Sequence, residues 1–416
     1  MWVHSTVLEN GLKVIVQEMP AQRTVTALVI FNRGAKDEDL EQSGISHFVE
    51  HVALHTGSHR GELRRLNQQL LSRGAQQNAD TAKEFTTYYM TVLEDQLPTA
   101  IQTFGLLLTE FDPERKTVET ERQVILREIS MHEQSARRIF DLFSECLWGN
   151  YTLGLPVLGR RETVSGFALE QLAAVVSRDY TADNAALVVI GRCEHRQVLE
   201  MANRALSEWR PSGIRRGEYN VSQSPSILVH REAHAQNALI CVGAPGVPHG
   251  HPSAPALDLL NSILASPGEG RLFKLLREER GLVYQLTGLS THYRHAGAFG
   301  VVTNCATGDL QQVSRLIFQE FERVRRLGVT EEELESAKAR LALERFLEAE
   351  NVITLAKRLG AAALFGEMYT VQSLNLQTQS ITPEEVMAAA QEYLRRRNLS
   401  FAGIGSFSEE EIAAII

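Results

Sequence analysis

Ile45-Ser-His-Phe-Val-Glu-His-Val-Ala-Leu54 predicts a helix with three polar side chains on one face. His47 and His51 are four residues apart, so on a helix their imidazoles lie one turn above each other. Glu50 follows His47 by three residues and shares that face. Two neutral imidazoles can bind one Zn²⁺ ion, and the carboxylate can act as a base beside it. The alternative is two histidines that are packed or solvated on an amphipathic helix without a metal.

A second segment, Val118 to Ile129, offers a third ligand. It carries two carboxylates among apolar residues on what should be its inward face. The residues that recur there at steps of three and four are Val118, Glu121, Ile125, Glu128 and His132. A buried carboxylate needs a partner, because its charge is costly to desolvate. A zinc ion would supply the compensating charge, and an ion pair with Arg122 or Arg127 is the alternative.

These two segments resemble the pitrilysin, insulin-degrading enzyme and mitochondrial processing peptidase family of zinc metallopeptidases. The order H-x-x-E-H is the inverzincin signature. In that family a glutamate ligand follows in a helix with the pattern E-R-x-V-I-L-x-E, and Glu121-Arg-Gln-Val-Ile-Leu-Arg-Glu128 matches it. The resemblance implies that His47, His51 and Glu128 bind one zinc ion per chain and that Glu50 is the catalytic base. It also implies that Glu121 orients the site from behind the ligands.

Two further stretches extend the resemblance. The segment from Gly74 to Tyr88 resembles the strand beside the metal, where Asn78 and Ala79 would receive the substrate backbone. An ordinary turn at Asn78-Ala79-Asp80 is the alternative. In the second half, Arg277 and Tyr284 have the seven-residue spacing of an arginine and a tyrosine that hold the substrate carbonyl in the family.

The chain also contains an internal duplication. The helix pattern Leu169 to Tyr180 and the strand pattern Asn184 to Gly191 occur again as Pro383 to Tyr393 and Asn398 to Gly405. The duplication predicts two homologous domains of the α+β class, 1–212 and 225–416, each an antiparallel-rich sheet covered on one face by helices. Only the first would carry the zinc motif. The resemblance implies that the two domains form half of a clamshell chamber.

The bulk properties fit a globular protein of two domains. The chain has 416 residues, 44% hydrophobic and 22% charged, with a net charge of −9. No basic run could neutralise phosphates, so we expect no nucleic-acid partner. No apolar run reaches the roughly eighteen residues of a membrane span. The first residues already have a strand-like pattern, and the four cysteines are widely separated, so we expect no targeting segment and a cytoplasmic location.

The sequence therefore predicts a zinc-dependent endopeptidase that hydrolyses peptides or unfolded segments, with Glu50, Arg277 and Tyr284 as catalytic residues. A homodimer is the first expectation, because one chain carries both the zinc residues and the Arg-Tyr pair. The alternatives are the catalytic subunit of a heterodimeric peptide-maturation protease, a non-catalytic scaffold of the same fold, and a zinc hydrolase that acts on small amides.

Overall fold

The chain forms two compact units, each built around one β-sheet. The computed structural model describes residues 3–56, 61–109, 111–213, 219, 221 and 226–415. Unit 1 comprises Met1–Met131, Pro156–Arg216 and Leu347–Thr370, and unit 2 comprises His132–Leu155, Gly217–Phe346 and Val371–Ile416. The sequence predicts domains at 1–212 and 225–416. Unit 1 also contains Leu347–Thr370 from the second of these segments, and unit 2 also contains His132–Leu155 from the first. The link between those segments lies largely outside the described residues.

The sheet of unit 1 has six strands, with β1 and β4 as its two edge strands. Their order is β1 (Val3–Val7), β2 (Lys13–Glu18), β6 (Ala185–Gly191), β3 (Thr24–Phe31), β5 (Thr86–Leu93) and β4 (Gln76–Thr81). Neighbouring strands are antiparallel except β2 and β6, which run parallel. The central strands β3 and β6 are rich in Val, Ile, Leu and Ala and are almost entirely buried, because helices cover both of their faces.

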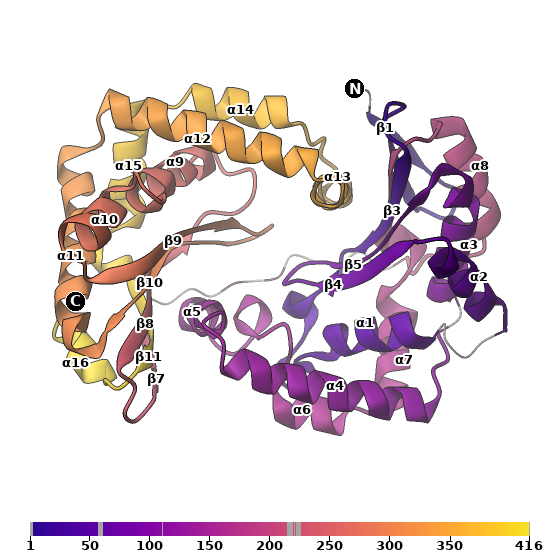
Figure 1. Ribbon diagram of the computed structural model, residues 1–416, viewed down its shortest axis with the longest axis horizontal. Helices are drawn as coiled ribbons and strands as arrows, with labels where there is room; N and C mark the ends of the chain where they lie inside the picture. The colour runs from indigo at the N-terminus through magenta and orange to yellow at the C-terminus, as the bar shows by residue number, and fades with distance from the viewer. Residues whose placement is uncertain are drawn as a thin grey trace. The chain divides into compact units, whose positions relative to one another are not determined.

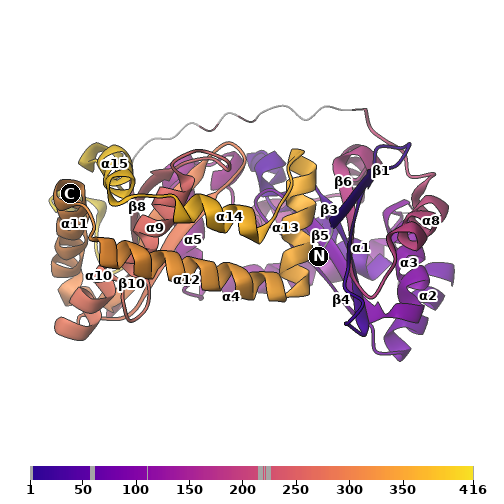
Figure 2. The ribbon, with the colours of Figure 1, turned by 90° about the horizontal axis from the view of Figure 1, so that it is seen from above.

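Most helices of unit 1 pack on one face of this sheet. They are α1 (Ile45–Thr56), α2 (Gly61–Ser72), α3 (Leu97–Thr109), α4 (Arg115–Glu133), α6 (Arg161–Gly166), α7 (Leu169–Asp179) and α8 (His195–Leu206). The opposite face is covered by α13 (Val352–Phe365), as Figures 1 and 2 show. Its residues Leu355 and Leu359 pack against Leu28 and Ile30. A helix from the second half of the sequence thus completes the core of unit 1.

Unit 2 repeats this plan. Its five strands are ordered β7 (Ile227–Arg231), β11 (Ser400–Gly405), β8 (Asn237–Gly246), β10 (Gly297–Ala306) and β9 (Val283–His292), and only β7 and β11 are parallel. One face carries α9 (Ala254–Ala265), α11 (Leu310–Leu327) and α15 (Pro383–Tyr393). The opposite face is covered by α5 (Arg138–Trp148), with Phe143 and Trp148 in the core.

The remaining helices of the second half are α10 (Arg271–Phe273), a π-helical turn at Lys274–Glu279, α12 (Glu331–Glu350), α14 (Val371–Gln379) and α16 (Glu409–Ala413). The α+β class with two similar units is confirmed. Two features go beyond the expectation of an antiparallel-rich sheet with one covered face. Each sheet contains a parallel pair, and each has a helix on its second face.

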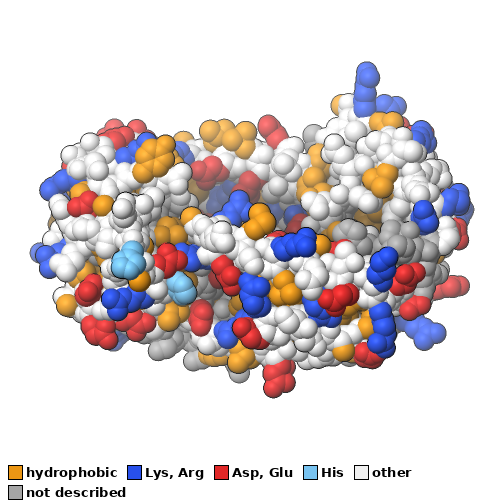
Figure 3. Space-filling view, turned by 60° about the horizontal axis from the view of Figure 1, so that its bottom comes forward, with side chains coloured by type: hydrophobic (Ala, Val, Ile, Leu, Met, Phe, Trp, Pro, Cys, Tyr) orange, Lys and Arg blue, Asp and Glu red, His pale blue; other side chains and the backbone are white. Residues whose placement is uncertain are grey.

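Among the described residues, none of the helices combines the length and the low polarity that crossing a membrane requires. On the face drawn in Figure 3, Lys and Arg side chains are interspersed with Asp and Glu. The part of that face which the structure describes therefore has no broad area of a single charge.

Candidate metal centre

Helix α1 holds its polar residues against the core. Phe48, Val49 and Val52 are buried beneath the helix and fix its rotation, and the four-residue spacing of His47 and His51 puts both imidazoles on one side. His47 is only 6% exposed, and its ring centre lies 4.6 Å from that of His51. Burial, and secondly the neighbouring His51, lower the pKa of His47 to about 4. The His47 imidazole is therefore neutral at neutral pH, the form that binds a metal.

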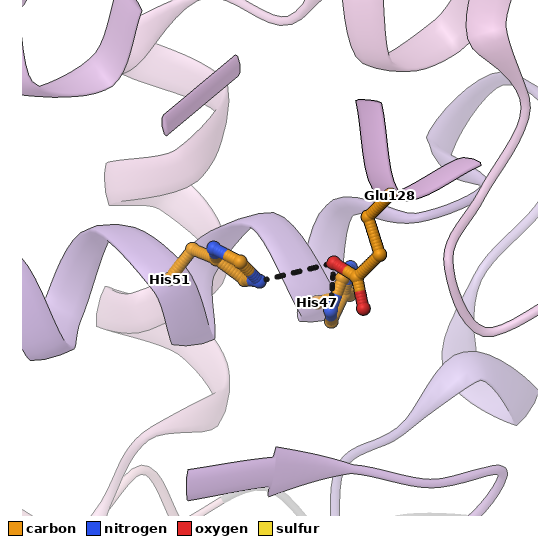
Figure 4. Close-up of side chains that lie close together, drawn as sticks. All are labelled: His47, His51 and Glu128. Carbon is orange, nitrogen blue, oxygen red and sulfur yellow. Dashed lines mark ion pairs between the residues drawn. The ribbon is translucent and has the colours of Figure 1, made fainter. Parts of the chain in front are cut away.

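Glu128, on α4, faces both imidazoles. Its Oε2 atom lies 3.5 Å from His51 Nε2 and 3.7 Å from His47 Nε2 (Figure 4). One ligand atom from each residue lies within 4.8 Å of the others. Zinc ligands about 2.0–2.1 Å from a tetrahedral ion are roughly 3.3 Å apart. These three residues therefore fit a single zinc ion with small adjustments of their side chains.

Glu121 lies one heptad before Glu128 on α4 and contacts His51. With the proton on Nδ1, His51 donates a hydrogen bond of 3.2 Å to Glu121 Oε2, and Glu121 is only 5% exposed. This tautomer leaves His51 Nε2 unprotonated toward Glu128. Burial lowers the pKa of His51, but the Glu128 and Glu121 carboxylates outweigh burial and raise it above its ordinary value. The geometry is that of a carboxylate orienting a metal-binding histidine.

Glu50 is buried beside the two histidines. Burial raises the pKa of its carboxyl to about 7, although a hydrogen bond from Thr81 partly opposes this rise. Thr81 Oγ1 donates that bond to Glu50 Oε2 at 2.7 Å. A carboxyl group with a pKa near neutrality can both accept and return a proton at physiological pH.

Strand β4 places Asn78 and Ala79 at the edge of the sheet. Ala79 packs into the same core as α1, on the face that also carries Thr81. The Ala79 N–H donates to its neighbour's side chain, Asn78 Oδ1, at 2.9 Å. The two residues thus form part of a strand and not an isolated turn, and they lie on the strand that contacts Glu50.

Arg277 and Tyr284 meet in unit 2. The Arg277 guanidinium carbon lies 4.9 Å from the centre of the Tyr284 ring and 5.2 Å from that of Phe273. Its Nη1 also donates to the carbonyl oxygen of Tyr284. Tyr284 is 70% exposed, so the pair presents an aromatic hydroxyl and a cation to solvent.

The sequence interpretation missed Thr81, which contacts Glu50, and Lys357, which contacts strand β4 from the opposite face of the sheet. Thr81 lies two positions after Ala79, so strand alternation could have placed it on the face of α1. Lys357 forms an ion pair with Asp80 and lies 5.4 Å from the centre of the Tyr89 ring. It comes from α13, on the opposite face of the sheet, and no local pattern connects it with β4.

The comparisons with known proteins agree over almost the whole chain. Residues 13–161 match the family described as insulinase (peptidase family M16), and residues 166–341 match the peptidase M16 inactive domain. An uncharacterized zinc protease of Mycobacterium tuberculosis is 30% identical over 400 residues, which cover 94% of this chain and 91% of that protein. A probable mitochondrial-processing peptidase subunit beta of Schizosaccharomyces pombe is 26% identical and covers 97% of this chain, with 91% of its own length aligned.

A solved structure supports the fold alone. The crystal structure described as a peptidase M16 inactive domain from Pseudomonas fluorescens has a TM-score of 0.88 at 19% identity and covers 98% of this chain and 99% of its own. Two α+β units, one with a His-His-Glu group that could hold a metal, define a class of two-unit α+β proteins with a candidate metal centre. Within that class, the chain belongs to peptidase family M16, which confirms the resemblance inferred from the sequence.

Proposed function

We propose that the chain is a zinc-dependent endopeptidase that hydrolyses peptides or unfolded segments. The observation that carries this proposal is the position of Glu50 beside a group of three ligands, His47, His51 and Glu128, within 4.8 Å of one another. Three protein ligands leave a fourth position for water or substrate, as in catalytic zinc sites. One zinc ion per chain follows from this set.

The protein residues have separate roles in the proposed reaction. When bound, zinc supplies Lewis-acid chemistry that polarises the peptide carbonyl and acidifies water. Glu50 takes the proton of the attacking water on a carboxylate oxygen and returns it to the leaving amine. Thr81 keeps the Glu50 carboxyl in one orientation through its 2.7 Å hydrogen bond. The hydrogen bond between His51 Nδ1 and Glu121 would orient the His51 ring toward the metal.

Strand β4 would bind the substrate backbone. It is the last strand of its sheet, so an extended peptide can add to it as a further strand. Ala79 is the contact that we assign to the peptide, because it lies on this edge strand and its N–H donates to the neighbouring Asn78 side chain. Asn78 would release this N–H and bond the peptide instead.

Arg277 and Tyr284 would complete the site by donating hydrogen bonds to the carbonyl oxygen as negative charge develops on it. In the proposed homodimer, each copy supplies this pair to the other, and each copy lines part of an enclosed chamber. The alternative is a heterodimer with a homologous subunit that lacks the zinc motif. The name of the Schizosaccharomyces pombe relative, a subunit beta, supports that alternative. All four cysteines are free thiols, as in a protein of the reducing cytoplasm.

The proposal is tested with the Glu50→Gln variant and a fluorogenic, unstructured peptide. We expect this variant to keep one zinc per chain and to lose peptidase activity by orders of magnitude, because it lacks the base but keeps the ligands. Glu41→Gln, an exposed residue just before α1, is the control and should behave as wild type. Wild-type turnover by the Glu50→Gln protein, or an active chain free of metal, would refute the proposal.

A further inference from the structure

We propose that Glu38 is a positioning residue of the zinc site, which it serves by holding the first turn of α1 in place. This inference rests on the proposed zinc site. The side chain is 4% exposed and lies in the segment that precedes the helix. Its Oε2 accepts a hydrogen bond from Gly44 N at 2.7 Å, and its Oε1 accepts one from Ser46 N at 2.8 Å. Both oxygens of one carboxylate therefore bind the start of α1.

Helix geometry explains why this contact is strong. The first N–H groups of a helix have no partner within the helix, and the helix dipole makes this end positive. A carboxylate that accepts hydrogen bonds from two of these N–H groups gives them acceptors and also places a negative charge at the positive end of the helix. Most helices obtain such a cap from a Ser, Thr, Asp or Asn at the boundary itself. Here the cap comes from a residue six positions before Gly44.

Arg33 holds the same turn from a second direction. It is 1% exposed, and its Nε donates to Ser46 Oγ at 2.9 Å. Its Nη1 donates to the Asp37 carbonyl at 3.0 Å and lies 3.0 Å from Asp179 Oδ2. Burial raises the pKa of Glu38 to about 7, and the Arg33 charge partly opposes this rise. The buried guanidinium of Arg33 thus lies close enough to the Glu38 carboxylate to affect its pKa.

The other side of the turn is closed by backbone contact. Gly44 has φ of +92°, and a Cβ atom there would lie 2.6 Å from the Cα of Gly159. Thr163 Oγ1 donates to the Ser43 carbonyl at 2.6 Å. The chain thus enters α1 along one path, with backbone on one side and the Glu38 and Arg33 side chains on the other.

The position of His47 connects this turn to the metal. His47 is the third residue of α1 and directly follows Ser46, which both Glu38 and Arg33 contact. The apolar side chains Phe48, Val49 and Val52 anchor the middle of the helix whether or not the cap is present. Loss of the cap should therefore loosen the first turn, and the imidazole of His47 with it, before it affects the rest of unit 1. A metal site tolerates displacements of only about 0.5 Å.

The experiment compares Glu38→Gln and Glu38→Ala with the exposed control Glu41→Gln. We measure the zinc Kd of each apo protein by competition with a chromophoric chelator, and its thermal unfolding without metal. We expect Glu38→Ala to bind zinc about 10 to 100 times more weakly, the usual effect of losing a group that orients a ligand. Glu38→Gln keeps one acceptor oxygen and should lie between Glu38→Ala and wild type. Glu41→Gln should match wild type.

Cobalt binding separates positioning from simple stability. The visible absorption bands of Co²⁺ depend on ligand geometry, so they should change in Glu38→Gln and stay constant in Glu41→Gln. An unchanged zinc Kd and cobalt spectrum in folded Glu38→Gln would overturn the inference, even if the protein unfolded at a lower temperature. Should Glu38→Ala fail to fold, Glu38→Gln alone decides. A wild-type chain that bound no zinc would instead overturn the proposed function, and this inference with it.

Discussion

At the scale of single residues, the candidate centre combines groups whose environments differ. His47 is deeply buried and its pKa is lowered to about 4, whereas His51 is held by two carboxylates and its pKa is raised. An ion would remove this difference, because both rings bind a metal in the neutral form.

We predict that His47→Ala and His51→Ala lose zinc, and that Glu128→Gln binds it much more weakly because an anionic ligand becomes a neutral amide. Zinc per chain, measured by elemental analysis after gel filtration, checks this. His132→Ala is a matched control on the same helix as Glu128, since His132 pairs with Asp141 in unit 2 at 2.7 Å. Full zinc content in both histidine variants would contradict the ligand assignment.

At the scale of elements, two close contacts show what holds each unit together. In unit 1, α13 approaches the sheet closely at Gly360, where an added Cβ would lie 2.5 Å from Ile30 Cγ2 and 3.1 Å from Val188 Cγ2. In unit 2, Arg271 of α10 binds both oxygens of Glu333 on α12 at 2.6 Å. Both contacts join segments far apart in the sequence.

We predict that Gly360→Ala destabilises unit 1 by about 1–3 kcal/mol, because the extra methyl group overpacks the interface between helix and sheet. Urea denaturation followed by circular dichroism measures the change. Ile30→Ala removes the opposing Cγ2, so the double variant should lose less stability than the sum of the two single variants. Gly308→Ala has no atom within 4 Å of its added Cβ and serves as the neutral control. Additive effects would show that α13 does not pack closely on this sheet.

We predict a pH-dependent loss of stability in Glu333→Gln. Burial would raise the pKa of Glu333, but its bonds to Arg271 and to the Thr330 N–H outweigh burial and lower it from 4.5 to about 2. Because the folded-state pKa is depressed, the ionised form stabilises the fold above pH 4.5, and this stabilisation disappears as the pH falls toward 2. After allowance for solvent screening, it amounts to about 1–2 kcal/mol.

Urea titrations of wild type and Glu333→Gln between pH 7 and pH 3 test this. The variant should be less stable at pH 7, and the difference should shrink below pH 4.5. Glu332→Gln, the exposed neighbour, should match wild type throughout. A difference that stays constant with pH would assign the effect to packing and not to charge.

At the scale of the whole molecule, the chain carries the proposed ligands in unit 1 and the Arg277–Tyr284 pair in unit 2. A homodimer in which each copy completes the site of the other predicts complementation. Glu50→Gln protein and Arg277→Ala/Tyr284→Phe protein should each be impaired, and their mixture should regain activity. With random exchange, half the chains lie in mixed dimers with one intact site of two, so recovery should approach about a quarter of wild type.

Peptidase assays on the exchanged mixture, with subunit exchange demonstrated by mass-tagged chains, decide this point. Each variant mixed with itself is the control. Absence of recovery despite exchange would mean that the pair acts within its own chain or outside the site, and it would make the heterodimer the preferred assembly.

The family, the α+β class and the candidate ligands could all be predicted from the amino-acid sequence alone. The helical spacing of His47, Glu50 and His51 is a local property, so it survives any packing arrangement. Glu128 was found because its helix carries a second recognisable pattern, and the duplication predicted two similar units. In the structure, one ligand atom each of His47, His51 and Glu128 lies within 4.8 Å of the others, which agrees with the predicted ligand set.

The segments that complete each hydrophobic core could be assigned only from the folded chain. Helix α5 packs in unit 2 and α13 in unit 1, although the sequence places them in the opposite halves. The hydrogen bonds of Glu38 and Arg33 to Ser46 at the start of α1, and the ion pair of Lys357 with Asp80, were likewise not predicted from the sequence. An amphipathic pattern predicts that a helix buries one face, but it does not indicate which sheet that face packs against. The sheet on which a helix packs is determined by long-range packing. Close packing depends on the shapes of both surfaces, and these surfaces exist only once the sheets have formed.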